Sequence, residues 1–167
     1  TYDPITYENT GKPYAEILEP VKKDLDGFRA YMTAKRALEV SKKGLESGIP
    51  LDAAKAGVKA GKEQYEPVFQ ERIAYLNRML ELLQKAGILS EESVNTLKSA
   101  NKAYVPFYRL FEDQGNTMQA GGTTMRNPIK TMVGSEREIY DPIQSDIRDT
   151  FLFTALAEKN LSRQAFA

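Results

Sequence analysis

The strongest hydrophobic pattern in the chain runs from about residue 66 to residue 86. Its apolar side chains recur every three or four residues on one stripe: Phe69, Ile73, Leu76, Leu80 and Leu83. Charged residues, among them Glu71, Arg72 and Glu81, fall largely away from the stripe. This spacing is typical of an amphipathic α-helix. Burial of each stripe residue contributes about 1.5 to 3 kcal/mol before entropy is subtracted, so we expect this helix at the centre of the core.

Two helices are expected before it. From Pro20, which suits a first helical position, apolar residues follow the same spacing, and Gly44 suits the end of that helix. Those apolar residues are Val21, Leu25, Phe28, Met32 and Leu38. Asp52 can cap a second segment rich in Ala and Lys, which Gly57 and Gly61 make a weak helix. The short link at 44–50 favours antiparallel neighbours.

Two more helices are expected after it. Gly87 stands where a left-handed residue ends a helix, and Ser90 begins a short helix with Val94 and Leu97 inward and a stop at Asn101. Further on, Asp141 and Pro142 are suited to be the N-cap and first residue of a last helix. Its predicted inner side carries Ile143, Ile147, Phe151, Ala155 and Leu156.

The remaining segments lack helical periodicity. Residues 1–16 are polar and rich in turn residues, so we predict an extended arm followed by one helical domain at 17–167. Residues 103–111 carry four aromatics and Pro106, which forces extended backbone before it, and 112–138 form a long Gly-rich loop. The prediction is an all-α fold, a bundle of four to five helices with an extended aromatic segment. The end of the chain within a helical pattern suggests a fragment of a larger chain.

Composition removes most enzyme chemistries. The chain has no Cys and no His, which excludes thiolate nucleophiles, imidazole bases, Cys/His zinc sites and the Glu-x-x-His pairs of di-metal bundles. Its 23 basic residues balance its 23 acidic ones, so no global field favours nucleic acid or an anionic membrane. No apolar run approaches the ~20 residues of a membrane-spanning helix. We expect no cofactor and no metal.

Two chemical motifs do not fit the sites that they resemble, and a third possibility stays open. The run from Gly57 to Lys62 has the wrong glycine spacing and no preceding strand for a phosphate loop. The run from Asp24 to Gly27 places its glycine too early for a calcium loop and is interpreted as a solvated helix face. A carboxylate-dependent cell-wall glycosidase stays an alternative, with Glu112 or Glu138 as its acid, although no spacing marks either.

Binding residues are expected around the aromatic segment. Tyr, Phe and Arg are enriched at interface anchors, although the same aromatics can simply seal the core. The basic side chains of the following loop could contact nucleic-acid backbone, which is the second alternative function. The candidate partner-binding residues are Tyr104, Phe107, Tyr108, Arg109, Arg126, Lys130 and Arg137.

Four strings, taken in order, carry a resemblance to a known group of proteins. They are Ala86-Gly87-Ile88-Leu89-Ser90-Glu91-Glu92, Asn101-Lys102-Ala103-Tyr104-Val105-Pro106-Phe107-Tyr108-Arg109, Asn127-Pro128-Ile129-Lys130 and Tyr140-Asp141-Pro142-Ile143-Gln144-Ser145. Over residues 17–167 the chain resembles a helical region of large polyvalent proteins and internal virion (ejection) proteins of tailed phages. The resemblance implies a module of a very long bacteriophage chain, located in the virion interior and delivered to the host cell. It carries over no catalytic residue.

The expected function is therefore structural. We predict a non-catalytic interaction module that uses the aromatic segment and the final helix to pack against flanking modules of the same chain, other virion proteins or other copies.

Overall fold

A computed structural model describes residues 3, 6, 8–100 and 141–166 of the chain. These residues form five α-helices and one 3-10 helix and contain no strand, which confirms the all-α prediction. In chain order the elements are α1 (Tyr14–Leu18), η1 (Glu19–Val21), α2 (Leu25–Lys42), α3 (Leu51–Lys85), α4 (Glu91–Ala100) and α6 (Pro142–Ala165). The aromatic segment, the Gly-rich loop and all seven candidate partner-binding residues lie outside the described residues.

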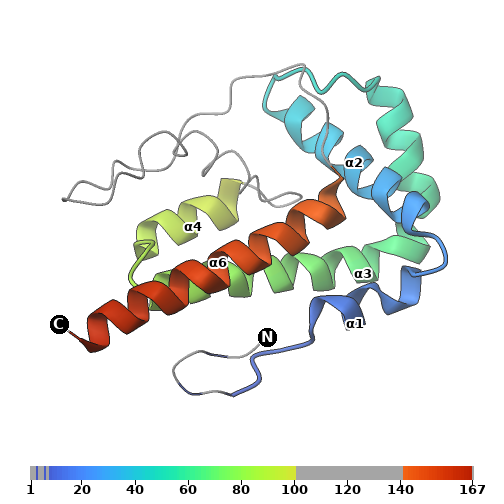
Figure 1. The fold of residues 1–167 in the computed structure, drawn as a ribbon. Coiled ribbons are helices and arrows are strands. Elements are labelled where there is room, and N and C mark those ends of the chain that lie inside the picture. The colour runs from blue at the N-terminus through green and yellow to red at the C-terminus, as the bar shows by residue number, and fades with distance from the viewer. Residues whose placement is uncertain (1–2, 4–5, 7, 101–140, 167) are drawn as a thin grey trace.

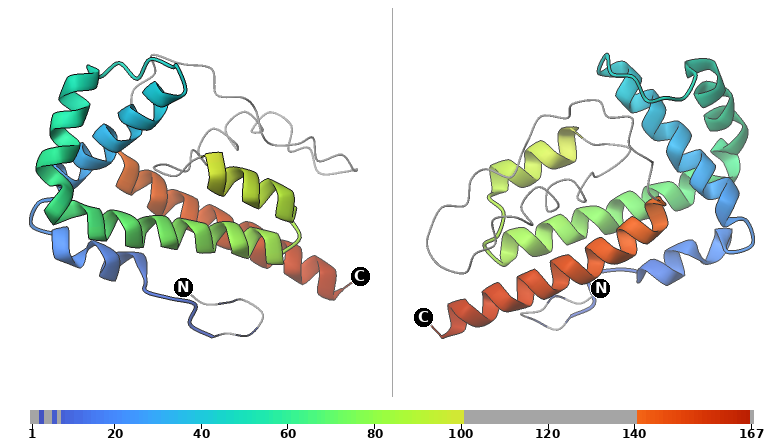
Figure 2. Two further views of the ribbon diagram at one scale, coloured as in Figure 1. Left: turned by 180° about the vertical axis from the view of Figure 1, so that it is seen from behind. Right: turned by 45° about the horizontal axis from the view of Figure 1, so that its top comes forward.

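Helix α3 organises the fold. Helix α2 lies against its first part, whereas α4 and α6 run along its second part (Figures 1 and 2). The sequence predicts two helices here, but the structure has one, which bends between its two parts with Pro67 inside it. A proline has no N–H to bond the preceding turn and favours a bend. The Ala-rich segment is thus the start of the central helix, with Pro50 rather than Asp52 as its N-cap.

The apolar stripe predicted on this helix is confirmed. Phe69, Leu76, Leu80 and Leu83 are fully buried, and Ile73 packs half-buried at the edge of the core. One prediction about the same stretch is wrong: Arg72, expected on the solvent side, is among the most buried side chains of the protein. Its partner on another helix, which the local pattern does not contain, accounts for that position.

The turn after α3 follows the predicted chemistry. Gly87 has a φ of 71°, and the Ile88 amide donates to the Leu83 carbonyl at 2.9 Å, which completes the end of the helix. The Ser90 hydroxyl then accepts a hydrogen bond from the Ser93 amide at 3.1 Å and caps α4. Val94 and Leu97 are buried as predicted. The expected stop at Asn101 lies outside the described residues.

The first part of the chain departs from the prediction in two places. Helix α1 begins at Tyr14, inside the range assigned to the extended arm, because Tyr14 and Ile17 are buried against the core. Pro20 belongs to the short 3-10 helix, and α2 begins only at Leu25. Asp24, interpreted from sequence as part of a helix face, is the N-cap, and its carboxylate accepts a hydrogen bond from the Gly27 amide at 3.0 Å.

Helix α6 begins as predicted but turns a different face to the core. Asp141 caps it, accepting from the Ile143 amide at 2.9 Å, and a proline occupies the first turn. Ile143 is buried as expected. Ile147 and Phe151, however, are 44% and 74% exposed, and the predicted inner residues Ala155 and Leu156 are exposed and half-buried. The other buried positions of the helix are Pro142, Ser145, Asp146, Asp149, Phe153 and Ala157.

Candidate functional site

The most tightly organised polar group of the protein lies between α1, α3 and α6. Arg72 of α3 and Asp146 of α6, 1% and 4% exposed, form two parallel hydrogen bonds, from Nε to Oδ2 at 2.5 Å and from Nη2 to Oδ1 at 2.8 Å. The Tyr14 hydroxyl of α1 donates to the same Oδ2 at 2.5 Å. A single carboxylate therefore joins three elements that are far apart in sequence.

The charges of this group are fixed by their neighbours. Burial works against a charged guanidinium, but the charge and hydrogen bonds of Asp146 raise the pKa of Arg72. Burial and the charge of Asp146 raise the pKa of Tyr14, so the phenol keeps its proton and acts as a donor. Arg72 and Tyr14 are thus held as hydrogen-bond donors to one buried carboxylate, which is a structural arrangement.

A second carboxylate lies one turn further along α6. Asp149 is 5% exposed, and burial together with the charge of Asp146 raises its pKa to about 7. At the next residue, the Thr150 hydroxyl donates to the Asp146 carbonyl at 2.7 Å and lies 2.9 Å from the Tyr75 hydroxyl. A carboxyl with such a pKa is a familiar feature of acid–base sites. Here the carboxyl is buried on the inward side of α6.

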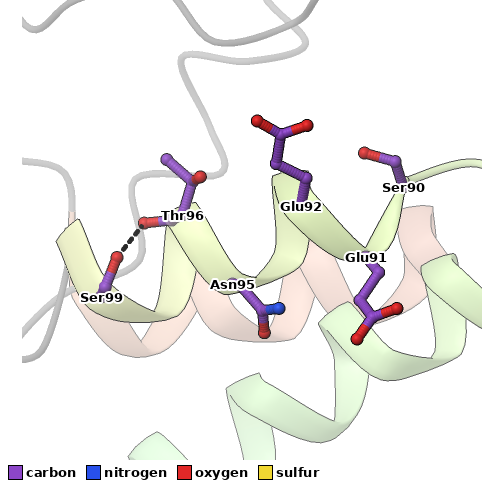
Figure 3. Close-up of a pocket in the computed structure, with 6 residues that line it drawn as sticks. All are labelled: Ser90, Glu91, Glu92, Asn95, Thr96 and Ser99. Carbon is purple, nitrogen blue, oxygen red and sulfur yellow. Dashed lines mark hydrogen bonds between the residues drawn. The ribbon is translucent and has the colours of Figure 1, made fainter.

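Two hollows of the described surface hold no comparable group. One lies on α4 and its cap, where Figure 3 shows six polar side chains with one hydrogen bond, from the Ser99 hydroxyl to the Thr96 carbonyl at 3.0 Å. All six are exposed: Ser90, Glu91, Glu92, Asn95, Thr96 and Ser99. Their two carboxylates, on Glu91 and Glu92, are exposed to solvent.

A second hollow, beside Pro67 on α3, borders a carboxylate that is already engaged. Glu66 accepts hydrogen bonds from the Tyr31 hydroxyl and from Lys35 Nζ, the latter at 2.9 Å to each oxygen. Burial works against the charge, but these hydrogen bonds lower the pKa of Glu66. Glu66 therefore joins α2 to α3.

The outward side of α6 is the clearest candidate for binding. Ile147, Phe151 and Ala155 are exposed at positions i, i+4 and i+8, and we call these three residues the outer face of α6. Side chains at this spacing line up along one side of a helix. The outer face lies opposite the buried side that carries Asp146 and Phe153. An exposed aromatic next to an exposed aliphatic side chain is the kind of surface that marks a protein contact.

Sequence reasoning did not identify either side of α6 correctly. The signal for the buried side was present, since Ile143, Asp146, Phe153 and Ala157 also recur at helical spacing. The local pattern does not reveal this side, because aspartates without a partner ordinarily lie in solvent and the partner Arg72 is 74 residues away in the chain. The predicted binding residues at 104–137, and Glu112 and Glu138 of the glycosidase alternative, lie outside the described residues.

The described residues contain no group of three or more acidic side chains arranged to hold a metal ion. Among the described helices, none combines the length and the apolar character that crossing a membrane requires. No family model matches the chain, and neither a curated protein nor a solved structure matches it. The resemblance to tailed-phage proteins therefore stays a prediction.

Proposed function

We propose that this chain is a non-catalytic structural module that binds another polypeptide through the outer face of α6. The observation that carries the proposal is the 74% exposure of Phe151 beside Ile147 on a helix whose opposite side is held in the core. Exposed aromatics are common anchors of protein interfaces because they bury a large area with few rotatable bonds. The resemblance to internal virion proteins supplies the proposed setting, in which such modules pack together inside a capsid.

The partner we propose is the same helix of a second copy. The outer face is a narrow apolar strip of a kind that pairs with another helix, and a two-fold contact brings the same strip from each copy together. The exposed charges nearby are of both signs: Arg148, Glu158 and Lys159. The whole chain has a net charge of zero, so copies do not repel one another at long range.

Sedimentation over a concentration series tests this proposal. The unsubstituted chain should associate as its concentration rises, and Phe151→Ser should remain a monomer with unchanged helix content by circular dichroism. Ile147→Ser should weaken association, whereas Leu51→Ser at the start of α3 should not, although Leu51 is 43% exposed and Ile147 44%. A monomeric unsubstituted chain at millimolar concentration, or undiminished association of Phe151→Ser, would overturn the proposal.

The two alternatives from sequence are less supported. The residues assigned to glycoside hydrolysis and to nucleic-acid backbone lie outside the described part of the chain. Within that part, the carboxylates with lowered pKa values, Asp24, Glu66 and Asp141, are held by hydrogen bonds to their own protein. No described observation favours either alternative over an interaction module.

A further inference from the structure

The contact between α6 and α3 contains an imbalance of buried charge. Asp146 and Asp149 both lie on the buried side of α6, and Arg72 is the buried cation that α3 presents to them. Two of the Arg72 nitrogens are bonded to Asp146, and its third, Nη1, is buried without a hydrogen-bond partner. No described cation forms an ion pair with Asp149. With both aspartates ionised, this interface would hold two negative charges against one positive charge.

Among the described residues, the charged groups around Asp149 do not restore the balance. On α6 itself, Asp146 repels a negative charge at Asp149 and Arg148, on the exposed side, attracts it. From α3, Arg72 attracts it, and the Tyr75 hydroxyl is engaged with Thr150. From α1, the Tyr14 hydroxyl is engaged with Asp146, and from α2 Arg29 bonds Asp141 at 3.0 Å, at the beginning of α6. Burial and Asp146 outweigh these attractions.

We propose that α6 docks onto α3 with a proton bound at Asp149, so that α6 is held more firmly in mildly acidic solution than at neutral or alkaline pH. The proton removes the surplus negative charge from the interface at the moment of docking. Neither the outer face of α6 nor any partner is needed for this proton binding. The docking of α6 would depend on pH within the fold of a single chain.

The sign and the pH window follow from linkage. An aspartate in a released, solvated α6 has a pKa of about 3.9, whereas the docked Asp149 has a pKa of about 7. Below about pH 4 the carboxyl is protonated in both states, and above about pH 7 it is ionised in both. Between these limits only the docked state binds the proton, so the equilibrium constant for release of α6 should rise about tenfold per pH unit. The chain has no histidine, so no imidazole titrates in this window.

The direct test is the titration of Asp149 in the unsubstituted protein, followed by the NMR shift of its carboxyl carbon. The reference is the midpoint of about 3.9 of an unperturbed aspartate. We expect the Asp149 midpoint two to three pH units above that value. A midpoint within about one unit of that reference would overturn the proposal. This measurement needs no variant and therefore does not depend on any substitution folding.

The functional test compares Asp149→Asn with the unsubstituted protein by amide hydrogen exchange, at matched pH values from 5 to 8. Asparagine mimics the protonated side chain, so the protection of α6 amides in the variant, relative to the unsubstituted chain, should grow about tenfold per pH unit and level off above pH 7. In the control variant Glu158→Gln, on the exposed side of the same helix, the protection of α6 amides relative to the unsubstituted chain should not change with pH. The same pH-independent relative protection in Asp149→Asn would contradict the proposal.

Discussion

Arg72 of α3 and Asp146 of α6 meet inside the core through two parallel hydrogen bonds of 2.5 and 2.8 Å. This pair selects which side of α6 faces inward, because a buried aspartate must lie where a buried cation can reach it. Phe153 and Ala157 follow Asp146 into the core, and Ile147 and Phe151 are left on the surface. One ion pair thereby determines which apolar residues of α6 lie on the surface.

Removing one member of this pair should be severe. In Arg72→Met, Asp146 stays buried without its cation, and breaking a buried pair in this way costs about 3 to 5 kcal/mol of unfolding free energy. Urea denaturation at pH 7 measures the loss. The double variant Arg72→Met with Asp146→Leu leaves no charge stranded and should lose clearly less than the single variant. A double variant as unstable as the single one would contradict this account.

The two phenylalanines of α6 should respond oppositely to truncation. Phe153 is fully buried, so Phe153→Ala removes core contacts and leaves a cavity, which costs about 3 to 5 kcal/mol. Phe151 is largely exposed, and Phe151→Ala should change the unfolding free energy by less than about 0.5 kcal/mol. Denaturation of both variants below the concentration at which copies associate checks the prediction. Similar losses would mean that α6 is rotated relative to this description.

Two glycines of α3 form a second matched pair. A Cβ at Gly61 would lie 2.7 Å from ring atoms of both Tyr31 and Tyr65, so Gly61→Ala forces these packed rings apart and should cost about 1 to 3 kcal/mol. A Cβ at Gly57 would lie 3.4 Å from the Ala34 Cβ, which is ordinary contact. Gly57→Ala should therefore stabilise the helix, by about 0.5 to 1 kcal/mol. Thermal unfolding followed by circular dichroism measures the change in stability of each variant. A gain in both variants, or a loss in both, would count against the close approach of α2 and α3.

Stability in strong acid should depend on Glu66. The hydrogen bonds from Tyr31 and Lys35 outweigh burial and lower the pKa of Glu66 below its ordinary value. Ionised Glu66 therefore stabilises the fold above about pH 4.5, and this stabilisation is lost as the pH falls through the lowered pKa of the folded protein. Glu66→Gln should flatten the fall in unfolding free energy between pH 4.5 and 2, measured by urea denaturation. Glu71→Gln, at an exposed ion pair with Lys12, should leave it unchanged.

Glu66 and Asp149 lower the unfolding free energy in adjoining pH ranges. Asp149 lowers the unfolding free energy as pH rises from about 4 to 7, whereas Glu66 lowers it as pH falls below about 4.5. The two together place the highest stability at about pH 4 to 5. A maximum at pH 7 or above would contradict the assignment of Asp149 as the buried proton acceptor.

The candidate site was only partly predictable. The final helix was expected to take part in packing against a partner, and that expectation is retained in the proposed function. The residues now proposed for binding, Ile147 and Phe151, are not predicted by the sequence, because their hydrophobicity predicts an inward position. In water a helix buries its most apolar side unless something else fixes its orientation, and here a buried ion pair does so.

Features that depend on neighbours within one or two helical turns could be predicted from the amino-acid sequence alone. The caps at Ser90 and Asp141, the left-handed Gly87 and the apolar stripe from Phe69 to Leu83 all follow from local geometry. The continuity of α3 through Pro67 and the choice of the inward side of α6 depend on tertiary packing. A helix can absorb a proline when packing on both sides of it compensates for the lost hydrogen bond. Asp146 can be buried because a distant part of the chain supplies Arg72 as its partner, and the hydrophobic pattern of α6 alone does not reveal that partner.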